Sequence, residues 1–359
     1  MIKTVRDFNV RGKRVLVRCD FNVPLSEKGD ILDDFRIKKT IPTIEYLIER
    51  RGKIILMSHL DDPQGKIIEK LKLDKVQEKL IEYLDVSVAK AKDCVGSEIE
   101  KWIREMSEGG ILLLENLRFY KEEEENNLGF ARELSKLGDI YINDAFGVCH
   151  RAHASVVGVP NYLPKGIGFL LEKEIKILNG VIKNPQRPLV AIIGGAKVEN
   201  KIKLINKISE VADFILIGGL LNKELKDYNP PTTSSRSLRS RAPKNISLMN
   251  PQKIIGAKEG LDIGLEVINL FKEKISKAKT VFWNGPLGQI EKKEFTKGTQ
   301  EIAKAVIESG AFSVVGGGET VEFINKIGLT EKFNHVSTGG GAMMAYLTGE
   351  KLPGLEVLK

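Results

Sequence analysis

The chain has 359 residues, of which 42% are hydrophobic and 29% charged, and its formal net charge is +8. This composition excludes an intrinsically disordered chain, and the length favours two domains over one. No apolar run reaches the roughly 18 residues of a membrane span. The N-terminal stretch MIKTVRDFNVRGK also lacks the apolar core of a signal peptide, so we expect a cytoplasmic protein without a membrane partner.

The three cysteines, Cys19, Cys94 and Cys149, are widely spaced and form no CxxC pair. This spacing argues against a disulfide framework and against a zinc site. We therefore predict that all three are reduced and buried.

Short apolar runs recur along the chain, each followed by a polar or glycine signature and then by a helix-like stretch. The first half contains VLVRCDFN, IILMSHL, a weaker VSVAKAKD, ILLLENLRF and IYINDAFGVCHRAH. The second half contains LVAIIGGAK, FILIGGL, TVFWNGPLG, SVVGGGET and HVSTGGGA. Continuous apolar strands that alternate with helices predict parallel sheets covered on both faces. Strands of the first half end in Arg, His, Asp and Asn, whereas strands of the second half end in glycine pairs and triplets. We therefore expect two sheets, each with its own ligand beyond the carboxyl ends of its strands.

Two further segments have a distinct character. Between the halves, GFLLEKEIKILNGVIKNPQRP has apolar residues at helical spacing and predicts a linking helix. Residues 229–245, NPPTTSSRSLRSRAPKN, are rich in Pro, Ser and Arg and have no periodicity, so they predict a flexible loop.

The VLVRCDFN strand carries an unusual polar face. Because side chains alternate along a strand, Arg18, Asp20 and Asn22 point one way and the apolar residues between them point the other. Four more cationic or titratable residues close or follow the other first-half strands, namely Arg36, His59, Arg118 and Arg151. Each of them alone could be a solvated or salt-bridged surface residue.

Their shared position at strand ends is more informative than their identity. Several arginines at one sheet edge would repel one another unless a multiply charged anion lay among them. An Asp and an Asn beside the arginines suit a hydroxyl group, so the pattern indicates a small phosphorylated hydroxy acid. Single placement of the basic residues, with aromatics at only 6%, disfavours a nucleic-acid partner.

The second-half signatures GGAK, NGPLG, GGGET and STGGGA indicate close approach of the backbone to an anion. Glycine permits positive φ and removes the side chain, and N–H groups at a following helix start bind phosphate oxygens. Lys197 and Lys201 lie four residues apart at a helix start, where cations are disfavoured unless an anion is bound. Glu319 could hold Mg²⁺ on phosphate oxygens. The P-loop and protein-kinase signatures are absent, so we expect another kind of nucleotide site.

Ten motifs follow one another across nearly the whole chain, namely RCDFNVP, DDFRI, SHL, ENLRF, NDAFG, HRAHAS, GGAKV, WNGPLG, VVGGGET and STGGGA. In these motifs and their order the sequence resembles the phosphoglycerate kinase family. The resemblance implies two doubly wound parallel-sheet (Rossmann-like) α/β domains joined by a linking helix across a cleft. It also implies a monomeric glycolytic enzyme that reversibly transfers a phosphoryl group from 1,3-bisphosphoglycerate to ADP, giving 3-phosphoglycerate and ATP.

The resemblance also divides the chain. Residues 1–168 would bind 3-phosphoglycerate, residues 169–183 would form the linking helix, and residues 184–345 would bind ADP or ATP with Mg²⁺. Residues 346–359 would form a C-terminal tail that returns to the N-terminal domain.

The site residues implied by the resemblance fall into two sets. The phosphoglycerate set is Arg18, Asp20, Asn22, Arg36, His59, Arg118 and Arg151. The nucleotide set is Gly195, Lys197, Lys201, Gly218, Gly219, Asn284, Pro286, Glu291, Gly317, Gly318, Glu319, Thr320, Gly339 and Gly340. Glu291 would reach the ribose, Glu319 would hold the metal, and Arg36 and Lys197 would act at the transferring phosphoryl group. Phosphoryl transfer to a carboxylate needs no general base.

Three departures from the family pattern leave two alternatives open. Asp62 stands in SHLDDP where the family has an arginine, Glu319 replaces the usual aspartate, and residues 219–260 are shorter than in typical members and differ in sequence. The alternatives are a related phosphotransferase with an altered acceptor and a weakened nucleotide-binding relative. Because a binding module has no need of charges aimed at the moving phosphoryl group, Arg36 and Lys197 favour the enzyme.

Overall fold

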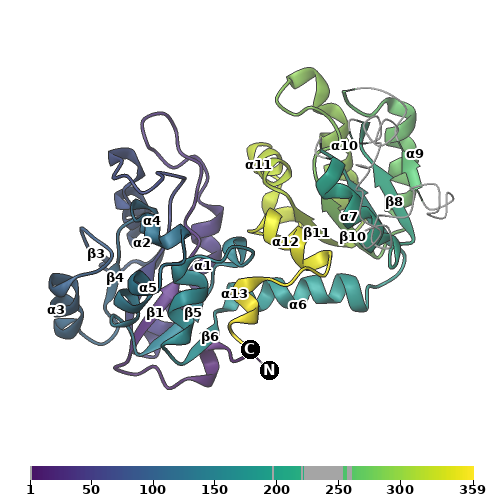
Figure 1. Ribbon diagram of the computed structural model, residues 1–359. Coiled ribbons are helices and arrows are strands. Elements are labelled where there is room, and N and C mark those ends of the chain that lie inside the picture. Colours follow the sequence, from purple (N-terminus) through teal and green to yellow (C-terminus); the bar gives the residue numbers. More distant parts are fainter. Residues whose placement is uncertain (1, 196–197, 220, 222–253, 257–260) are drawn as a thin grey trace, which may run out of the picture. The chain divides into compact units, whose positions relative to one another are not determined.

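The computed structural model describes residues 2–195, 198–219, 221, 254–256 and 261–359, and we consider only these. The chain divides into two compact units (Figure 1). The first unit comprises Met1–Ile175 and Lys351–Lys359, and the second comprises Lys176–Glu350. The predicted loop at residues 229–245 lies outside the described residues.

The first unit is built on a six-stranded parallel sheet with the order β3-β4-β2-β1-β5-β6. The strands are β1 (Arg14–Arg18), β2 (Lys53–Met57), β3 (Ala89–Lys90), β4 (Ile111–Leu113), β5 (Ile140–Asn143) and β6 (Lys165–Ile167). The chain winds from β1 toward one edge and then returns to β5 on the other side of β1. The loops after β1 and β5 therefore diverge, and this switch point is where open parallel sheets place their ligands.

Five helices of the first unit connect these strands, namely α1 (Phe35–Glu49), α2 (Asp74–Leu84), α3 (Ser97–Glu105), α4 (Lys121–Glu124) and α5 (Leu128–Ser135). A further helix, α13 (Pro353–Glu356), lies near the C-terminus. Shorter 3₁₀ turns cover Val5–Asp7, Glu69–Leu71, Leu117–Phe119, Phe146–Val148 and Val159–Asn161, and a π-helical turn covers Ala154–Gly158. In α1, Ile37, Ile41 and Ile44 recur at helical spacing and are buried. Such an apolar stripe is what packs a helix onto a core.

The second unit is also built on a six-stranded parallel sheet, but its order is β12-β11-β10-β7-β8-β9, so the chain adds β8 and β9 on one side of β7 and then β10, β11 and β12 on the other. Its strands are β7 (Leu189–Ile193), β8 (Phe214–Ile217), β9 (Ile254–Gly256), β10 (Thr280–Asn284), β11 (Phe312–Gly316) and β12 (His335–Val336). Its helices are α7 (Val198–Ser209), α9 (Leu265–Ser276), α10 (Lys297–Glu308), α11 (Gly318–Lys326) and α12 (Gly340–Leu347), with 3₁₀ turns at Lys293–Phe295 and Thr330–Lys332. Here the switch point lies between β7 and β10. Helix α6 (Phe169–Lys183) contains the boundary between the units.

The prediction of two parallel α/β sheets is confirmed. Every residue of β5, β7 and β10 is buried, as expected for strands covered on both faces. The sequence pattern missed β6 and β9, because each has only three residues and contains no long apolar run. The three cysteines are free and buried, as predicted.

The C-terminal residues belong to the first unit. The backbone N–H of Gly354 donates to the carbonyl of Cys149 at 2.9 Å, and Leu355 is buried. A Cβ at Gly354 would lie 2.7 Å from Cγ1 of Val156, so α13 packs closely on the segment around residues 149–156. In the described part of the chain, no helix combines the length and the apolar character needed to span a membrane.

We predict that Leu355→Ala destabilises the first unit by about 2 to 5 kcal/mol, because it leaves a cavity under α13. The chain has two tryptophans, so in a Trp283→Phe background Trp102 on α3 reports on this unit alone. Urea unfolding followed by Trp102 fluorescence measures the change. Lys359→Ala, at an exposed position, is the control. Equal stability of the two variants would contradict close packing of α13.

Candidate active site

The predicted phosphoglycerate residues of the first unit lie at or just after the ends of adjacent strands. Arg18 ends β1 and His59 follows β2, while Arg118 lies in the turn after β4 and Arg151 follows β5. Arg36 is in the first turn of α1. Parallel pairing of β4, β2, β1 and β5 brings these ends to one edge of the sheet.

His59 is surrounded by positive charge. Its pKa falls well below the usual range, chiefly because the ring is buried and also because Arg18, Arg118, Arg36 and Arg151 lie close by. Burial lowers the pKa of Arg118 as well, and Arg151 and Arg18 act in the same direction. A buried neutral histidine among four arginines is a strong site for an anion, since a bound anion would relieve their mutual repulsion.

A second group of contacts orders the loop after β1. Arg36 Nη1 donates to the carbonyl of Asn22 at 2.6 Å and lies 3.5 Å from Oδ1 of the buried Asp20. Oδ1 of Asn22 accepts a hydrogen bond from the backbone N–H of Asp61 at 2.8 Å. The Asn22 amide group therefore still has N–H donors to offer to a ligand.

Arg118 is positioned by the residues of its own motif, ENLRF. The side-chain oxygen of Asn116 accepts from the backbone N–H groups of Arg118 (3.1 Å) and Leu60 (3.2 Å), which ties the end of β4 to the loop after β2. Arg118 Nη1 donates to the carbonyl of Asp61 at 2.7 Å. Its Nη2 is buried without a hydrogen-bond partner in the described part of the chain. A buried guanidinium nitrogen without a partner is what a phosphate or carboxylate would satisfy.

Sequence reasoning missed several residues of this site. His150 and His153 flank Arg151. Burial and Arg151 lower the pKa of His150, and burial together with Arg118, Arg18 and Arg151 brings the pKa of His153 to about 3. The motif HRAHAS contains both histidines, but the sequence pattern identifies only Arg151 in it as a site residue. Glu123 and Ser155, which contact Arg18, were also missed.

In the second unit, the backbones of the loops after β7 and β10 are in close contact at the switch point. The backbone N–H of Gly194 donates to the carbonyl of Asn284 (3.0 Å), and that of Gly195 donates to the carbonyl of Pro286 (2.8 Å). A Cβ at Gly194 would lie 1.9 Å from the Pro286 oxygen. Two main chains can approach this closely only where glycine stands.

Lys201 enters this region from α7. Its buried ammonium group donates to Oδ1 of Asn284. Burial lowers the pKa of Lys201 to about 8, and the carboxylate of Glu319 opposes the shift. Asn284 Nδ2 and Thr320 Oγ1 are buried and have no partner among the described residues. These donors lie beside Gly317, whose φ of +97° no ordinary side chain adopts easily.

The remaining nucleotide residues are placed as follows. Gly218 and Gly219 follow β8, and the N–H of Gly219 donates to the carbonyl of Leu287 at 3.2 Å. A Cβ at Gly340 would lie 3.0 Å from Cα of Gly317, so the starts of α11 and α12 are in contact. Other members are Pro286 and Gly339, which are buried, and Gly318, Glu291 and Glu319, which are exposed.

Two residues of the predicted nucleotide set cannot be placed in this group. Among the described residues, Glu291 makes no hydrogen bond or ion pair with another member of the nucleotide set. Lys197 lies outside the described residues. The structure thus brings together Gly195, Lys201, Asn284, Gly317 and Thr320, a set suited to phosphate oxygens.

No three His, Cys, Asp or Glu side chains of the described residues lie close enough to one another to hold a metal ion. The exposed carboxylate of Glu319 and the hydroxyl of Thr320 are oxygen donors next to the phosphate-type site. Mg²⁺ binds with few protein carboxylates when substrate phosphates supply the other ligands. The donor set therefore fits Mg²⁺ only together with a bound polyphosphate.

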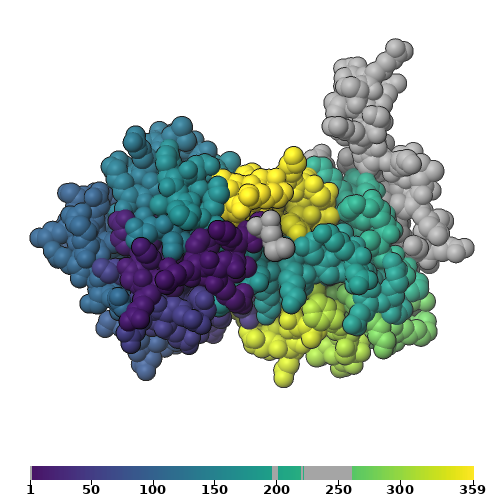
Figure 2. Space-filling view, turned by 90° about the horizontal axis from the view of Figure 1, so that it is seen from below, coloured from purple at the N-terminus to yellow at the C-terminus, as the bar shows by residue number. Residues whose placement is uncertain are grey.

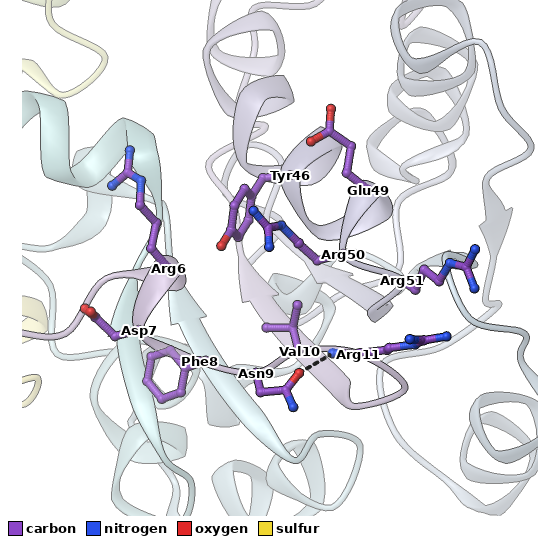
Figure 3. Close-up of a pocket in the computed structure, with 10 residues that line it drawn as sticks. All are labelled: Arg6, Asp7, Phe8, Asn9, Val10, Arg11, Tyr46, Glu49, Arg50 and Arg51. Carbon is purple, nitrogen blue, oxygen red and sulfur yellow. Dashed lines mark hydrogen bonds between the residues drawn. The ribbon is translucent and has the colours of Figure 1, made fainter.

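A separate pocket of about 570 Å³ in the first unit contains none of the predicted site residues (Figure 3). It is lined by residues 6–11, 46 and 49–51, and Figure 2 shows the purple N-terminal segment on the surface of this unit. Its charges have structural roles: Arg6 pairs with Glu172 at 2.6 Å, and Asp7 accepts from the Thr4 N–H at 2.7 Å. Arg50 follows the C-terminal end of α1, where the helix dipole favours cations.

One doubly wound unit gathers arginines around His59 at its switch point, and the other places glycine loops and the buried Lys201 at its own. This is the architecture expected of a two-domain phosphotransferase. The family model described as "Phosphoglycerate kinase" matches residues 5–229 and 231–350. The chain belongs to the phosphoglycerate kinase family, and it is an enzyme that transfers a phosphoryl group to a carboxyl acceptor.

Its relatives share the whole length of the chain. It is 44% identical to the phosphoglycerate kinase of Borreliella afzelii (strain PKo) over 391 positions, with 100% of this chain and 99% of the relative covered. It is 42% identical to that of Dictyoglomus turgidum (strain DSM 6724 / Z-1310), with 100% and 98% covered. Because 391 aligned positions exceed the 359 residues of the chain, the first relative has residues that this chain lacks.

Solved structures of phosphoglycerate kinases match the fold of this chain. The structure of phosphoglycerate kinase from Pyrococcus horikoshii OT3 matches with a TM-score of 0.85 and 32% identity, covering 100% of this chain and 98% of the other. The phosphoglycerate kinase from Coxiella burnetii matches with a TM-score of 0.82 and 30% identity, covering 100% and 99%. The predicted family and reaction class are confirmed.

We predict that anion binding in the second unit weakens as Lys201 loses its proton. Sulfate stays ionised over the range in which Lys201 titrates, so it is a suitable probe. With a pKa of about 8 in the free protein, affinity should fall by up to about tenfold between about pH 7 and about pH 9. Backbone NMR shifts of Gly317 to Thr320 measure the binding.

Lys201→Arg is the matched control, because a guanidinium keeps its charge throughout this range. Its sulfate affinity should be nearly independent of pH. The same pH dependence in both proteins would remove Lys201 from the anion site.

Proposed function

We propose that this chain carries out its family's reaction, with phosphoglycerate held by the first unit and the nucleotide by the second. The reaction is reversible phosphoryl transfer from 1,3-bisphosphoglycerate to ADP, which gives 3-phosphoglycerate and ATP in glycolysis. The observation that carries the assignment of the first unit is the convergence of four arginines on the neutral His59.

In the first unit, the phosphate of phosphoglycerate would be bound by Arg118, Arg151 and His59. Arg118 has a buried nitrogen free for it, and neutral His59 can donate one hydrogen bond without adding a charge. Asp20 and Asn22 would meet the hydroxyl and carboxyl end. Arg36, held on the loop after β1 by Asn22, would face the carboxylate that accepts the phosphoryl group.

In the second unit, the nucleotide phosphates would lie on the N–H groups at the start of α11 and on Gly195 and Lys201. Asn284, Pro286 and the glycines of the neighbouring loops would border them. Glu319 and Thr320 would hold Mg²⁺ on the phosphate oxygens, where the ion supplies further neutralisation of their charge. Glu291 would reach the ribose.

Catalysis would rest on alignment and neutralisation of charge. The accepting carboxylate is ionised at neutral pH, so no side chain has to remove a proton. Arg36 from the first unit and Lys197 from the second would stabilise the charge that spreads over the transferring group. The side chains of the first site are arranged for this before the substrate binds, because protein contacts already hold Arg36 and Arg118.

We also propose that the enzyme works as a monomer in a reducing compartment, the cytoplasm. The free state of all three buried cysteines supports this compartment. Neither proposed site requires residues from a second copy.

The test is a coupled assay of ATP formation from 1,3-bisphosphoglycerate and ADP with Mg²⁺. We expect turnover, and we expect Lys197→Ala to lower kcat by roughly a hundredfold to a thousandfold, because one donor to the transition state is lost. Lys203→Ala, on the exposed side of α7, is the control for loss of a lysine. Absence of turnover in the unaltered protein would favour the weakened nucleotide-binding relative.

A second candidate, a phosphotransferase with an altered acceptor, is favoured by one observation. Asp62 is exposed and lies close enough to Arg118 to oppose the lowering of its pKa. A carboxylate thus stands near the arginine proposed to bind substrate phosphate, where the family has a further arginine.

We predict that Asp62→Arg lowers the KM for 3-phosphoglycerate by about tenfold and leaves the KM for ATP almost unchanged. The change replaces repulsion by a charge-assisted hydrogen bond, which contributes roughly 1.5 to 3 kcal/mol. Steady-state kinetics at low ionic strength measure it, since salt screens exposed charges. Asp85→Arg, on an exposed loop, is the control. An unchanged KM for 3-phosphoglycerate would show that residue 62 does not face the substrate.

A further inference from the structure

Arg18 differs from the other arginines of the first site because protein groups occupy all three of its nitrogens. Its side chain is 0% exposed. Nε donates to Ser155 Oγ at 2.7 Å, Nη1 donates to the carbonyl of Cys19, and Nη2 lies 3.3 Å from Nδ1 of His59. An arginine held in this way acts on a ligand through its neighbours.

Glu123 lies at the other end of this set of contacts. It is in α4, within the run EEEE, and its side chain is also 0% exposed. Its two oxygens accept hydrogen bonds from the Ser155 hydroxyl (2.5 Å) and backbone N–H (2.9 Å). Oε1 is 3.8 Å from Nη2 of Arg18, so the carboxylate balances the buried guanidinium charge.

The contacts determine the direction of each hydrogen bond. A carboxylate only accepts, so the Ser155 hydroxyl donates to Glu123 and accepts from Nε of Arg18. A guanidinium only donates, so Nδ1 of His59 must be the acceptor and carries no proton. The proton of the neutral ring is therefore on Nε2.

We propose that Glu123, Ser155 and Arg18 are positioning residues that hold His59 as the neutral Nε2–H tautomer, ready to donate to an anion. The contribution to catalysis rests on the proposed function, because it assumes that His59 meets phosphoglycerate. The tautomer itself does not depend on that function.

The charged groups around His59 support a neutral ring. Those that act on it are Arg18, Arg118, Arg36 and Arg151, and all four disfavour a second proton. Nδ1 of His153 is 4.0 Å from Glu123, which is too far for a hydrogen bond, and the pKa of His153, about 3, keeps its ring uncharged at neutral pH. Glu123 thus remains paired with Ser155 and Arg18 at neutral pH.

The first test is NMR of the unaltered protein without substrate. The chain has four histidines, so long-range ¹H–¹⁵N spectra of ¹⁵N-histidine protein contain few ring signals, and a His59→Gln variant assigns one of them. We expect His59 to show an unprotonated Nδ1 and a protonated Nε2 from about pH 6 to about pH 8. A proton on Nδ1, or a charged ring in this range, would overturn the proposal.

The second test compares Ser155→Ala and Glu123→Gln with Glu125→Gln, an exposed residue next to α4. The first two should give a mixture of His59 tautomers and raise the KM for 3-phosphoglycerate by about tenfold, with a smaller effect on kcat. Glu125→Gln should change neither. If Glu123→Gln does not fold, Ser155→Ala alone carries the comparison, since it keeps the buried charge pair.

The outcomes separate this proposal from the proposed function. The expected tautomer together with no turnover of phosphoglycerate would count against the function and leave the positioning contacts standing. Normal turnover in Ser155→Ala with an unchanged KM and an unchanged His59 tautomer would overturn the positioning role.

Discussion

The guanidinium groups at the carboxyl edge of the first sheet repel one another, and the surrounding structure is arranged around that repulsion. One of them, Arg18, is fully buried and is balanced by the buried Glu123. Arg118 is partly balanced by Glu124 at 3.2 Å and still has a buried nitrogen without a partner in the described part of the chain. The histidines between them stay neutral. The positive charge that remains unbalanced is what selects a multiply charged anion as ligand.

The second unit meets the same need, an anion site at a switch point, with backbone groups in place of arginines. Its loops after β7 and β10 approach each other so closely that side chains are excluded at Gly194 and Gly285. N–H groups and the start of α11 then provide the donors, with the buried Lys201 beside them. Backbone N–H donors of this kind suit a flexible polyphosphate chain, whereas the fixed guanidinium groups of the first unit suit a compact phosphorylated acid.

The sequence predicts the sheets and the strand-end residues because both are local signals: apolar runs mark buried strands, and the polar residues come directly after them. It does not predict Glu123, since a run of four glutamates is typical of a solvated helix face. Only the contact with Ser155, which lies 32 residues away in sequence, makes one of the four buried. Likewise, His153 becomes informative only when folding places it beside Arg118 and Arg18. Strands as short as β6 and β9 depend on pairing with a neighbour, which an apolar pattern cannot reveal.

The two sites also differ in how their charge responds to pH. In the first unit arginines do not titrate, and the histidines stay neutral because their pKa values are lowered. The charge that the first site presents to phosphoglycerate, its proposed ligand, is therefore constant around neutral pH. In the second unit Lys201, with a pKa of about 8, loses its charge just above neutral pH unless a bound anion retains it. If the nucleotide binds in the second unit, as we propose, an alkaline pH dependence of the two sites should arise there, because Lys201 titrates near pH 8 and the arginines of the first unit do not titrate.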